Sequence, residues 1–184
     1  LVVKYPNRFA AAAASLNQED MDFSLGEVDR AITQLGLKGI QIFTSTHGVL
    51  PGDPKLRPLY EKMAKYDLPI WIHPTLARGR GTTGIETGPA MESIVSAGVF
   101  QDFPNIKFIM HHCGGGMPFF LNRMSLPSGM GRDTAGRVAQ LRKFYGDTAT
   151  IGTRGLMCGY EFFGPDHMVF GTDTPLGATF GQTL

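Results

Sequence analysis

The sequence has few cysteines, no long apolar run and almost no net charge. Its 184 residues include two cysteines, Cys113 and Cys158, too few for a disulfide framework and not paired like a structural zinc site. No apolar run approaches the ~20 residues that cross a bilayer. Lys+Arg 17 against Asp+Glu 16 gives a formal charge of +1, without the basic excess of nucleic-acid or membrane-surface proteins. We therefore expect a cytoplasmic protein that acts on small molecules, with no nucleic-acid or membrane partner.

Glycine and proline, in contrast, are frequent, with 24 and 12 residues, while hydrophobic residues make up 42% of the chain and exclude a disordered protein. The length fits one domain of ~100 to 200 residues, so we assign residues 1–184 to a single domain. Because the chain begins at Leu1 and stops at Leu184 in a loop-like stretch, we expect this domain to be incomplete at its N-terminus and also cut at its C-terminus.

Short apolar runs, typical of buried parallel strands, recur along the chain and are followed by stretches with helical spacing. The expected strands are residues 9–14, 38–43, 69–73, 106–111, 145–149 and 168–172. The expected helices lie around 25–35, 56–63, 90–97, 118–126 and 138–144, with loops at 77–88 and 127–136. Six such units make up most of a (β/α)₈ barrel, which typically needs ~250 residues. The sequence thus predicts an α/β, TIM-like barrel whose first two βα units are absent from this chain.

Polar side chains end three of these strands. His73 ends Pro-Ile-Trp-Ile-His, His111 and His112 end Phe-Ile-Met-His-His, and Asp173 ends Val-Phe-Gly-Thr-Asp. The carboxyl ends of barrel strands form the catalytic face, so these groups can converge there and bind zinc or a similar ion. Such an ion lowers the pKa of its bound water to ~7, and a nearby histidine or aspartate can move the proton. Because side chains alternate along a strand, we expect only one histidine of the pair to point into the barrel and favour His112.

Each of these residues also has a structural interpretation. His73 could be a hydrogen-bonded core histidine, and Asp173 could cap the turn that follows its strand, where aspartate is common. Their shared position at strand ends favours metal binding over both alternatives, because unrelated structural residues have no reason to gather on one face of the predicted barrel.

Four blocks of sequence carry a family resemblance. They are Ile-His-Pro at 72–74, Ile-Met-His-His-Cys-Gly-Gly-Gly-Met-Pro-Phe-Phe at 109–120, Tyr-Gly-Asp-Thr-Ala at 145–149 and Phe-Gly-Thr-Asp-Thr-Pro at 170–175. With them the chain resembles the amidohydrolase-related proteins of the aminocarboxymuconate-semialdehyde decarboxylase type over nearly its whole length. The His-His-x-Gly-Gly and Gly-Thr-Asp blocks are specific in combination, whereas either alone would be weak.

The resemblance implies a distorted (β/α)₈ barrel of the metal-dependent hydrolase type with one divalent metal, usually zinc and sometimes manganese. By motif, His73 and Asp173 match metal ligands, and His112 matches the histidine that holds the metal-bound water and shuttles its proton. Arg123 matches a position that in some decarboxylases binds a substrate carboxylate across a dimer interface, which implies a homodimer; a solvated helix arginine is the alternative. The sequence departs from the family in one respect: no His-x-His or Glu-x-His precedes His73.

Five further residues are weaker candidates. His47 could contact substrate, whereas His167, just before the last strand, is expected on the far face of the barrel. We expect Cys113 to pack beside the glycine turn rather than to act as a nucleophile. Glu86 and Asp147 could line the pocket, although a structural role is favoured for each.

The first functional hypothesis is a metal-dependent lyase that removes CO₂ from an aromatic or unsaturated carboxylate without an oxidant. His112 and Asp173 would manage the proton delivered to carbon, and Arg123 would orient the acid. The alternative is a metal-dependent hydrolase of an amide, lactone or related bond, which these motifs do not separate from the lyase. A third hypothesis, a non-catalytic barrel module for binding or assembly, rests on the lack of a first-strand ligand motif.

Overall fold

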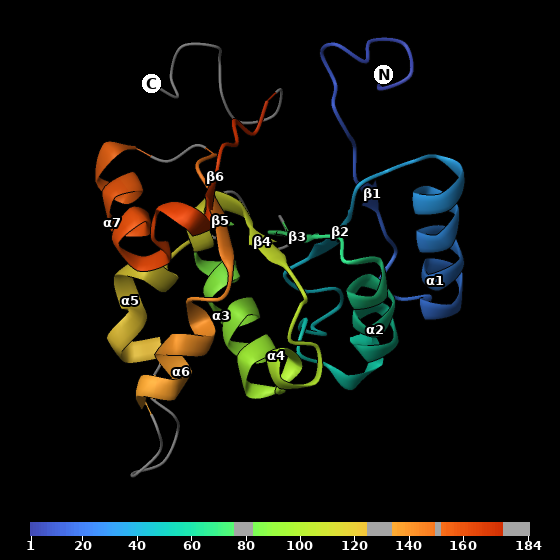
Figure 1. Cartoon of the computed structure of the whole chain (residues 1–184). Coiled ribbons are helices and arrows are strands. Elements are labelled where there is room, and N and C mark those ends of the chain that lie inside the picture. The colour runs from blue at the N-terminus through green and yellow to red at the C-terminus, as the bar shows by residue number, and fades with distance from the viewer. Residues whose placement is uncertain (76–82, 125–133, 150–151, 175–184) are drawn as a thin grey trace.

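The computed structural model describes residues 1–75, 83–124, 134–149 and 152–174, apart from the side chains of residues 83, 122–124 and 134. Within these residues, strands alternate with helices along the chain (Figure 1). The strands are β1 (Ala14–Ser15), β2 (Ile40–Phe43), β3 (Ile70–His73), β4 (Phe108–Met110), β5 (Tyr145–Asp147) and β6 (Met168–Val169). The expected α/β class is therefore confirmed.

The six strands form one sheet in the order β1-β2-β3-β4-β5-β6, and every neighbouring pair is parallel. The register places Ile40 beside Ile70 and Ile70 beside Phe108. Sequential parallel strands joined by helical crossovers are the arrangement of a βα barrel. As a result, the carboxyl ends of all six strands lie along the same edge of the sheet.

Helices connect the strands and cover the sheet (Figure 1). They are α1 (Met21–Asp29), α2 (Arg57–Tyr66), α3 (Thr83–Ser96), α4 (Val99–Asp102), α5 (Met117–Met124), α6 (Thr134–Leu141) and α7 (Thr153–Phe163). The Asp20 side chain caps α1 by accepting a hydrogen bond from the Phe23 N–H at 2.9 Å. In the described part of the chain, no helix has the length and apolar character needed to cross a membrane.

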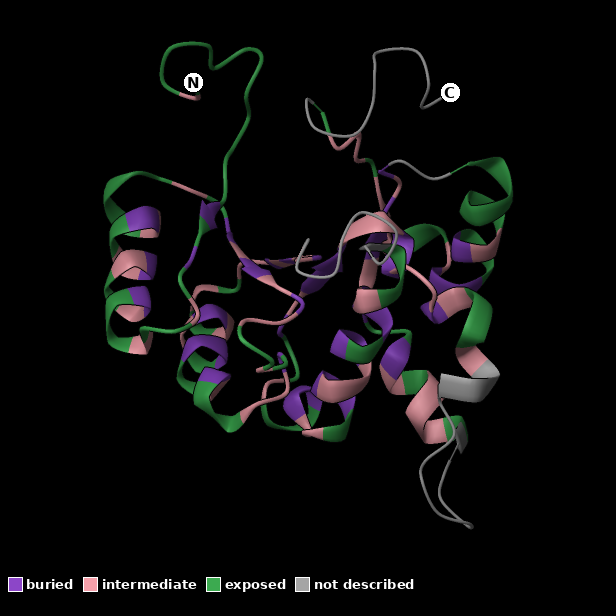
Figure 2. Cartoon of the chain, turned by 180° about the vertical axis from the view of Figure 1, so that it is seen from behind, coloured by how far each residue is buried: buried purple, intermediate pink, exposed green. Residues whose placement is uncertain are grey.

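Burial alternates along the central strands and separates two faces of the sheet. Ile40, Ile42, Ile70 and Ile72 are fully buried and belong to one hydrophobic core with residues of the helices. The intervening residues of β2 and β3 are only half-buried, and they include His73. In Figure 2 the buried residues follow the strands and the inward sides of the helices. His73 therefore lies on the sheet face opposite the one packed against the helices.

The first strand is much shorter than predicted. Instead of residues 9–14, the strand contains only Ala14 and Ser15, and residues 9–13 are exposed. The parallel ladder with the next strand begins where the Lys38 N–H donates to the Ala12 carbonyl, at 2.9 Å. Ahead of that point the apolar run packs against nothing that buries it, and alanine has a low strand propensity.

Two helices depart from the sequence prediction. α3 begins at Thr83, so the predicted loop is wrong for residues 83–88, while residues 76–82 lie outside the described part of the chain. The glycines of this segment suggested a loop, but α3 continues through Gly84 and Gly88 and through Pro89, which lies inside the helix and removes one of its backbone hydrogen bonds. α7, between β5 and β6, was not predicted from the sequence.

Candidate active site

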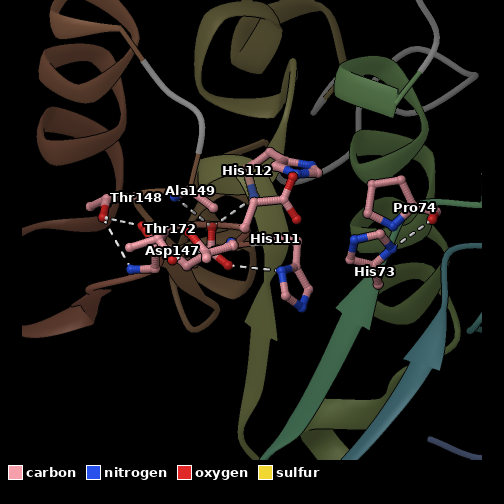
Figure 3. Close-up of polar contacts among 11 residues, drawn as sticks. His73, Pro74, His111, His112, Asp147, Thr148, Ala149 and Thr172 are labelled. Carbon is pink, nitrogen blue, oxygen red and sulfur yellow. Dashed lines mark hydrogen bonds and ion pairs between the residues drawn. The ribbon is translucent and has the colours of Figure 1, made fainter. Parts of the chain in front are cut away.

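The candidate residues all lie where strands end. His73 is the last residue of β3, Asp147 is the last residue of β5, and Asp173 follows β6. β4 stops at Met110, and a tight turn at residues 111–114 carries the two adjacent histidines (Figure 3). The parallel sheet thus gathers these side chains at one edge, although they belong to four separate βα units.

Three of the predicted side chains form a cluster. One potential ligand atom from each of His73, His112 and Asp173 lies within 4.8 Å of the other two. The Nε2 atom of His112 is 3.8 Å from Oδ2 of Asp173. All three residues are partly buried, so the site is shielded in part from water. The convergence expected from the strand ends is present; the role of each residue stays a prediction.

The backbone of this site is strained. His112, Cys113 and Asp173 have φ angles of +54°, +54° and +59°, which side-chain-bearing residues rarely adopt. Such conformations cost about 1–3 kcal/mol each and concentrate at functional sites, where surrounding structure holds them. Gly115, at φ +58° and ψ −126°, completes the turn after the histidines in a conformation suited to glycine.

His73 is oriented by its own loop. Its Nδ1 lies 2.8 Å from the Pro74 carbonyl oxygen, so the ring places a hydrogen on Nδ1 and leaves the Nε2 lone pair for another partner. Burial lowers the pKa of His73, and the neighbouring His111 lowers it further, against opposing effects of the Pro74 carbonyl and Asp173. The neutral imidazole that results is the form that binds metal ions.

The structure corrects the expectation that only one adjacent histidine can face the site. The rings of His111 and His112 have their centroids 4.7 Å and 5.7 Å from that of His73. The alternation rule does not apply because β4 already ends at Met110 and the next residues turn. His111, which the sequence analysis set aside, thus lies beside the cluster.

Asp147 is the most deeply buried charged group near the cluster, at 4% exposure. Burial by itself raises the pKa of this carboxyl. A hydrogen bond from His111 and backbone N–H groups of Ala149 and His112 outweigh that effect and hold the pKa below its ordinary value. These contacts therefore favour the ionised carboxylate.

The donor set fits a divalent metal ion. Two imidazoles and a carboxylate are the ligand types of zinc sites and also suit manganese. Within the described residues, two buried ring nitrogens, Nδ1 of His112 and Nε2 of His111, have no hydrogen-bond partner. Buried polar atoms without partners are rare in native proteins and are often explained by a bound ion or water.

A family model described as Amidohydrolase matches residues 1–179. The chain belongs to the amidohydrolase family. Among curated amidohydrolase relatives, it is 28% identical over 189 residues to 6-methylsalicylic acid decarboxylase of Penicillium expansum, covering 92% of this chain and 58% of the relative. It is 30% identical over 192 residues to 2-amino-3-carboxymuconate-6-semialdehyde decarboxylase of Dictyostelium discoideum, covering 95% and 53%. The chain therefore spans little more than half the length of these relatives.

A solved structure shares the fold. A dihydroxybenzoic acid decarboxylase from Polaromonas sp. JS666, with bound manganese and the inhibitor 2-nitroresorcinol, matches with a TM-score of 0.83 at 22% identity. The match covers 99% of this chain and 63% of that one. The six parallel strands of this amidohydrolase chain thus correspond to part of an amidohydrolase-type TIM barrel, as the sequence predicted.

Of the two predicted substrate-binding residues, His47 lies apart from the cluster, and the side chain of Arg123 is outside the described part of the chain. His47 sits in the loop after β2, where its side chain is 86% exposed and its Nδ1 lies against a carboxylate oxygen of Glu19. Arg123 lies in α5 of the amidohydrolase chain, but its side chain is outside the described part. Among the described residues, the cluster of His73, His112 and Asp173 does not include His47.

Glu86 supports the loop that follows His73. Its Oε2 accepts hydrogen bonds from the Thr75 N–H and hydroxyl, both at 3.0 Å, and from the Thr44 hydroxyl at 3.1 Å. These contacts tie the start of α3 to the ends of β2 and β3. The favoured structural role of Glu86 agrees with this geometry.

Cys113 and His167 match their expected places. Cys113 is buried against Gly159 of α7, and burial, with Asp147 nearby, raises the pKa of its thiol to about 12. A thiol so protonated is a poor nucleophile. His167 stacks on the Tyr145 ring at 4.3 Å, just before β6 and so at the opposite end of that strand from Asp173.

Proposed function

We propose that the protein carrying this chain is a metal-dependent decarboxylase that removes CO₂ from an aromatic or unsaturated carboxylate without an oxidant. One observation carries the proposal. His73, His112 and Asp173 meet at the carboxyl ends of barrel strands in a chain of the amidohydrolase family. The curated decarboxylases to which the chain is similar support this reaction over other chemistry of the family.

In this proposal His73 and Asp173 hold one divalent ion. Zinc is our first choice from the ligand types, and manganese is the alternative, supported by the manganese in the Polaromonas decarboxylase. When bound, the ion supplies positive charge that stabilises negative charge developing on the substrate. The neutral His73 ring, with Nδ1 turned to the Pro74 carbonyl, leaves Nε2 available for that ion.

His112 supplies the proton. As the bond between the carboxylate carbon and the substrate carbon breaks, CO₂ leaves and the electron pair stays on the substrate carbon. A proton from the His112 ring then forms the new C–H bond, so no oxidant or reductant is consumed. Asp173 would help to handle this proton, since its Oδ2 lies 3.8 Å from the Nε2 atom of His112.

The remaining assignments extend this proposal. Arg123 would bind the substrate carboxylate from a neighbouring subunit of a homodimer, because a guanidinium pairs with carboxylates in a bidentate manner. His47 would contact the substrate from the loop after β2. We place residues 1–184 in one domain and the protein in the cytoplasm, where its two cysteines stay reduced.

The experiment tests whether the substrate carboxylate is released as CO₂. The protein that carries this chain is incubated with a panel of aromatic carboxylates that includes 6-methylsalicylate and 2,6-dihydroxybenzoate, and both CO₂ and the product mass are measured. The proposal expects one CO₂ for each acid consumed and loss of the activity after divalent ions are chelated. Cleavage of amide or lactone substrates without CO₂ release would instead assign a hydrolase, and activity that survives chelation would contradict the metal requirement.

A further inference from the structure

One buried carboxylate contacts both adjacent histidines of the site, and the proposed mechanism does not use it. Asp147 Oδ2 lies 2.9 Å from Nδ1 of His111. Its other oxygen, Oδ1, accepts hydrogen bonds from the backbone N–H of His112 at 2.8 Å and of Ala149 at 3.1 Å. Figure 3 shows these contacts radiating from Asp147 at the end of β5.

These contacts determine where His111 carries its hydrogen. An ionised carboxylate can only accept hydrogen bonds, so the Nδ1 atom facing Asp147 must be the protonated one. In the neutral ring, Nε2 then keeps a lone pair. That atom is buried and has no partner among the described residues, and the ring stands edge-on to His73 at 4.7 Å. In Figure 3 the His111 ring lies between Asp147 and His73.

The same carboxylate supports the backbone of His112. This residue has a φ of +54°, which costs free energy unless neighbouring groups hold it. Its N–H, at the point where the chain leaves β4, donates to Asp147 across the sheet. The hydrogen bond fixes the turn that directs the His112 ring towards Asp173.

We propose that Asp147 is a positioning residue of this site. Through one oxygen it fixes the tautomer and orientation of the His111 ring, which packs against His73, and through the other it holds the backbone turn that aims His112. A carboxylate behind an imidazole is the usual way in which proteins orient histidines around metal ions. The inference rests on the proposed function, since His111 and His112, which Asp147 positions, lie beside the proposed ligands His73 and Asp173.

The test removes the negative charge of Asp147 while keeping the size of its side chain. In Asp147→Asn, the two backbone N–H groups of His112 and Ala149 claim the amide oxygen, which turns the amide NH₂ towards Nδ1 of His111. That nitrogen must then accept, so the hydrogen moves to Nε2. Two-bond ¹H–¹⁵N correlation spectra of ¹⁵N-histidine-labelled protein distinguish the two tautomers. We expect His111 as the Nδ1–H tautomer in the wild-type protein and as the Nε2–H tautomer in the variant.

A zinc titration against a chromophoric chelator provides the second readout. His111 packs edge-on against the proposed ligand His73, so loss of its fixed orientation in Asp147→Asn should weaken zinc binding, by less than the about 10–100-fold seen when a ligand loses its own hydrogen-bond partner. The matched control is Asp67→Asn, which alters an exposed carboxylate paired with Lys107 after α2 and should leave zinc affinity and His111 unchanged.

The outcomes separate cleanly. An Nε2–H tautomer for His111 in the wild-type protein would overturn the proposal, and this spectrum decides it even if Asp147→Asn does not fold. An Asp147→Asn variant with an unchanged tautomer and unchanged zinc affinity would overturn it as well. Because neither readout needs a substrate, an absence of CO₂ release with the expected tautomer switch would count against the decarboxylase assignment alone.

Discussion

Nε2 of His112 lies 3.8 Å from Oδ2 of Asp173, and both residues adopt the left-handed backbone conformation. The two side chains come from turns after different strands, β4 and β6, that are not neighbours in the sheet. Each turn costs conformational free energy that a simple loop would avoid. Two strained residues paired at the carboxyl ends of a parallel sheet persist only because the surrounding structure holds them, which is common at functional sites.

Replacing His112 separates proton transfer from metal binding. We expect His112→Ala to lower turnover by at least about 10²-fold, the usual scale for loss of a general acid, while metal content stays nearly unchanged. Steady-state kinetics of CO₂ release and elemental analysis of the same samples provide the two readouts. Loss of the metal together with the activity would make His112 a ligand instead of a proton donor.

The glycine turn beside the histidines should not tolerate a side chain. A Cβ on Gly115 would lie 2.2 Å from the Gly84 carbonyl oxygen, and its φ of +58° already excludes most residues. Gly115→Ala should therefore lower the free energy of unfolding by about 2–4 kcal/mol. Gly26→Ala is the control: nothing lies within 4 Å of that position in α1, so alanine should stabilise by about 0.5–1 kcal/mol. Urea unfolding measures both, and equal stability of the two variants would contradict the packing.

The two cysteines should differ in reactivity. Burial raises the pKa of Cys113 to about 12, whereas Cys158 on α7 is partly exposed. Brief treatment of the folded protein with iodoacetamide at neutral pH should label Cys158 and spare Cys113, as read by peptide mass spectrometry. In denaturant both should react. Rapid labelling of Cys113 in the folded protein would show that its thiol is neither buried nor protonated as described.

An ion pair between α1 and α2 should contribute a pH-dependent part of the stability. Asp29 Oδ2 lies 2.5 Å from the Lys62 ammonium, and Oδ1 accepts from the Tyr66 hydroxyl at 2.7 Å. The Lys62 bond, then the Tyr66 bond, lowers the pKa of Asp29 below its ordinary 3.8. The stabilisation is thus fully present above pH 3.8 and is lost as the pH falls through the lower folded value. The stability difference between wild type and Asp29→Asn should shrink on acidification; a difference that grows would reverse the sign.

The sequence anticipated the fold and much of the site because both depend on local patterns. Apolar runs ending in His73 and His112 place those residues at the carboxyl ends of strands, whatever the exact strand length. The predicted first strand was too long, because the hydrogen bonds that connect it to the next strand begin only at Ala12. α7 was missed because Gly155 and Gly159 interrupt its helical sequence pattern. Gly159 is required by tertiary packing, because a side chain there would collide with Cys113.

The roles of His111 and Asp147 depend on contacts between distant parts of the chain. Period-two alternation excludes His111 only if the strand continues, and nothing local says that it stops at Met110. Asp147 belongs to a strand end, like the other site residues, and that position was the available signal. Its bond to the His112 backbone crosses from β5 to β4, so only the register of the sheet reveals it.

Metal content tests the central claim most directly. The protein that carries this chain is purified alongside the double variant His73→Ala, Asp173→Ala, and divalent ions are quantified by inductively coupled plasma mass spectrometry. We predict about one zinc or manganese ion per wild-type chain and a strong loss in the double variant, with folding checked by circular dichroism. Equal metal content in the two proteins, or undiminished CO₂ release by a metal-free wild-type protein, would contradict a metal site built on His73 and Asp173.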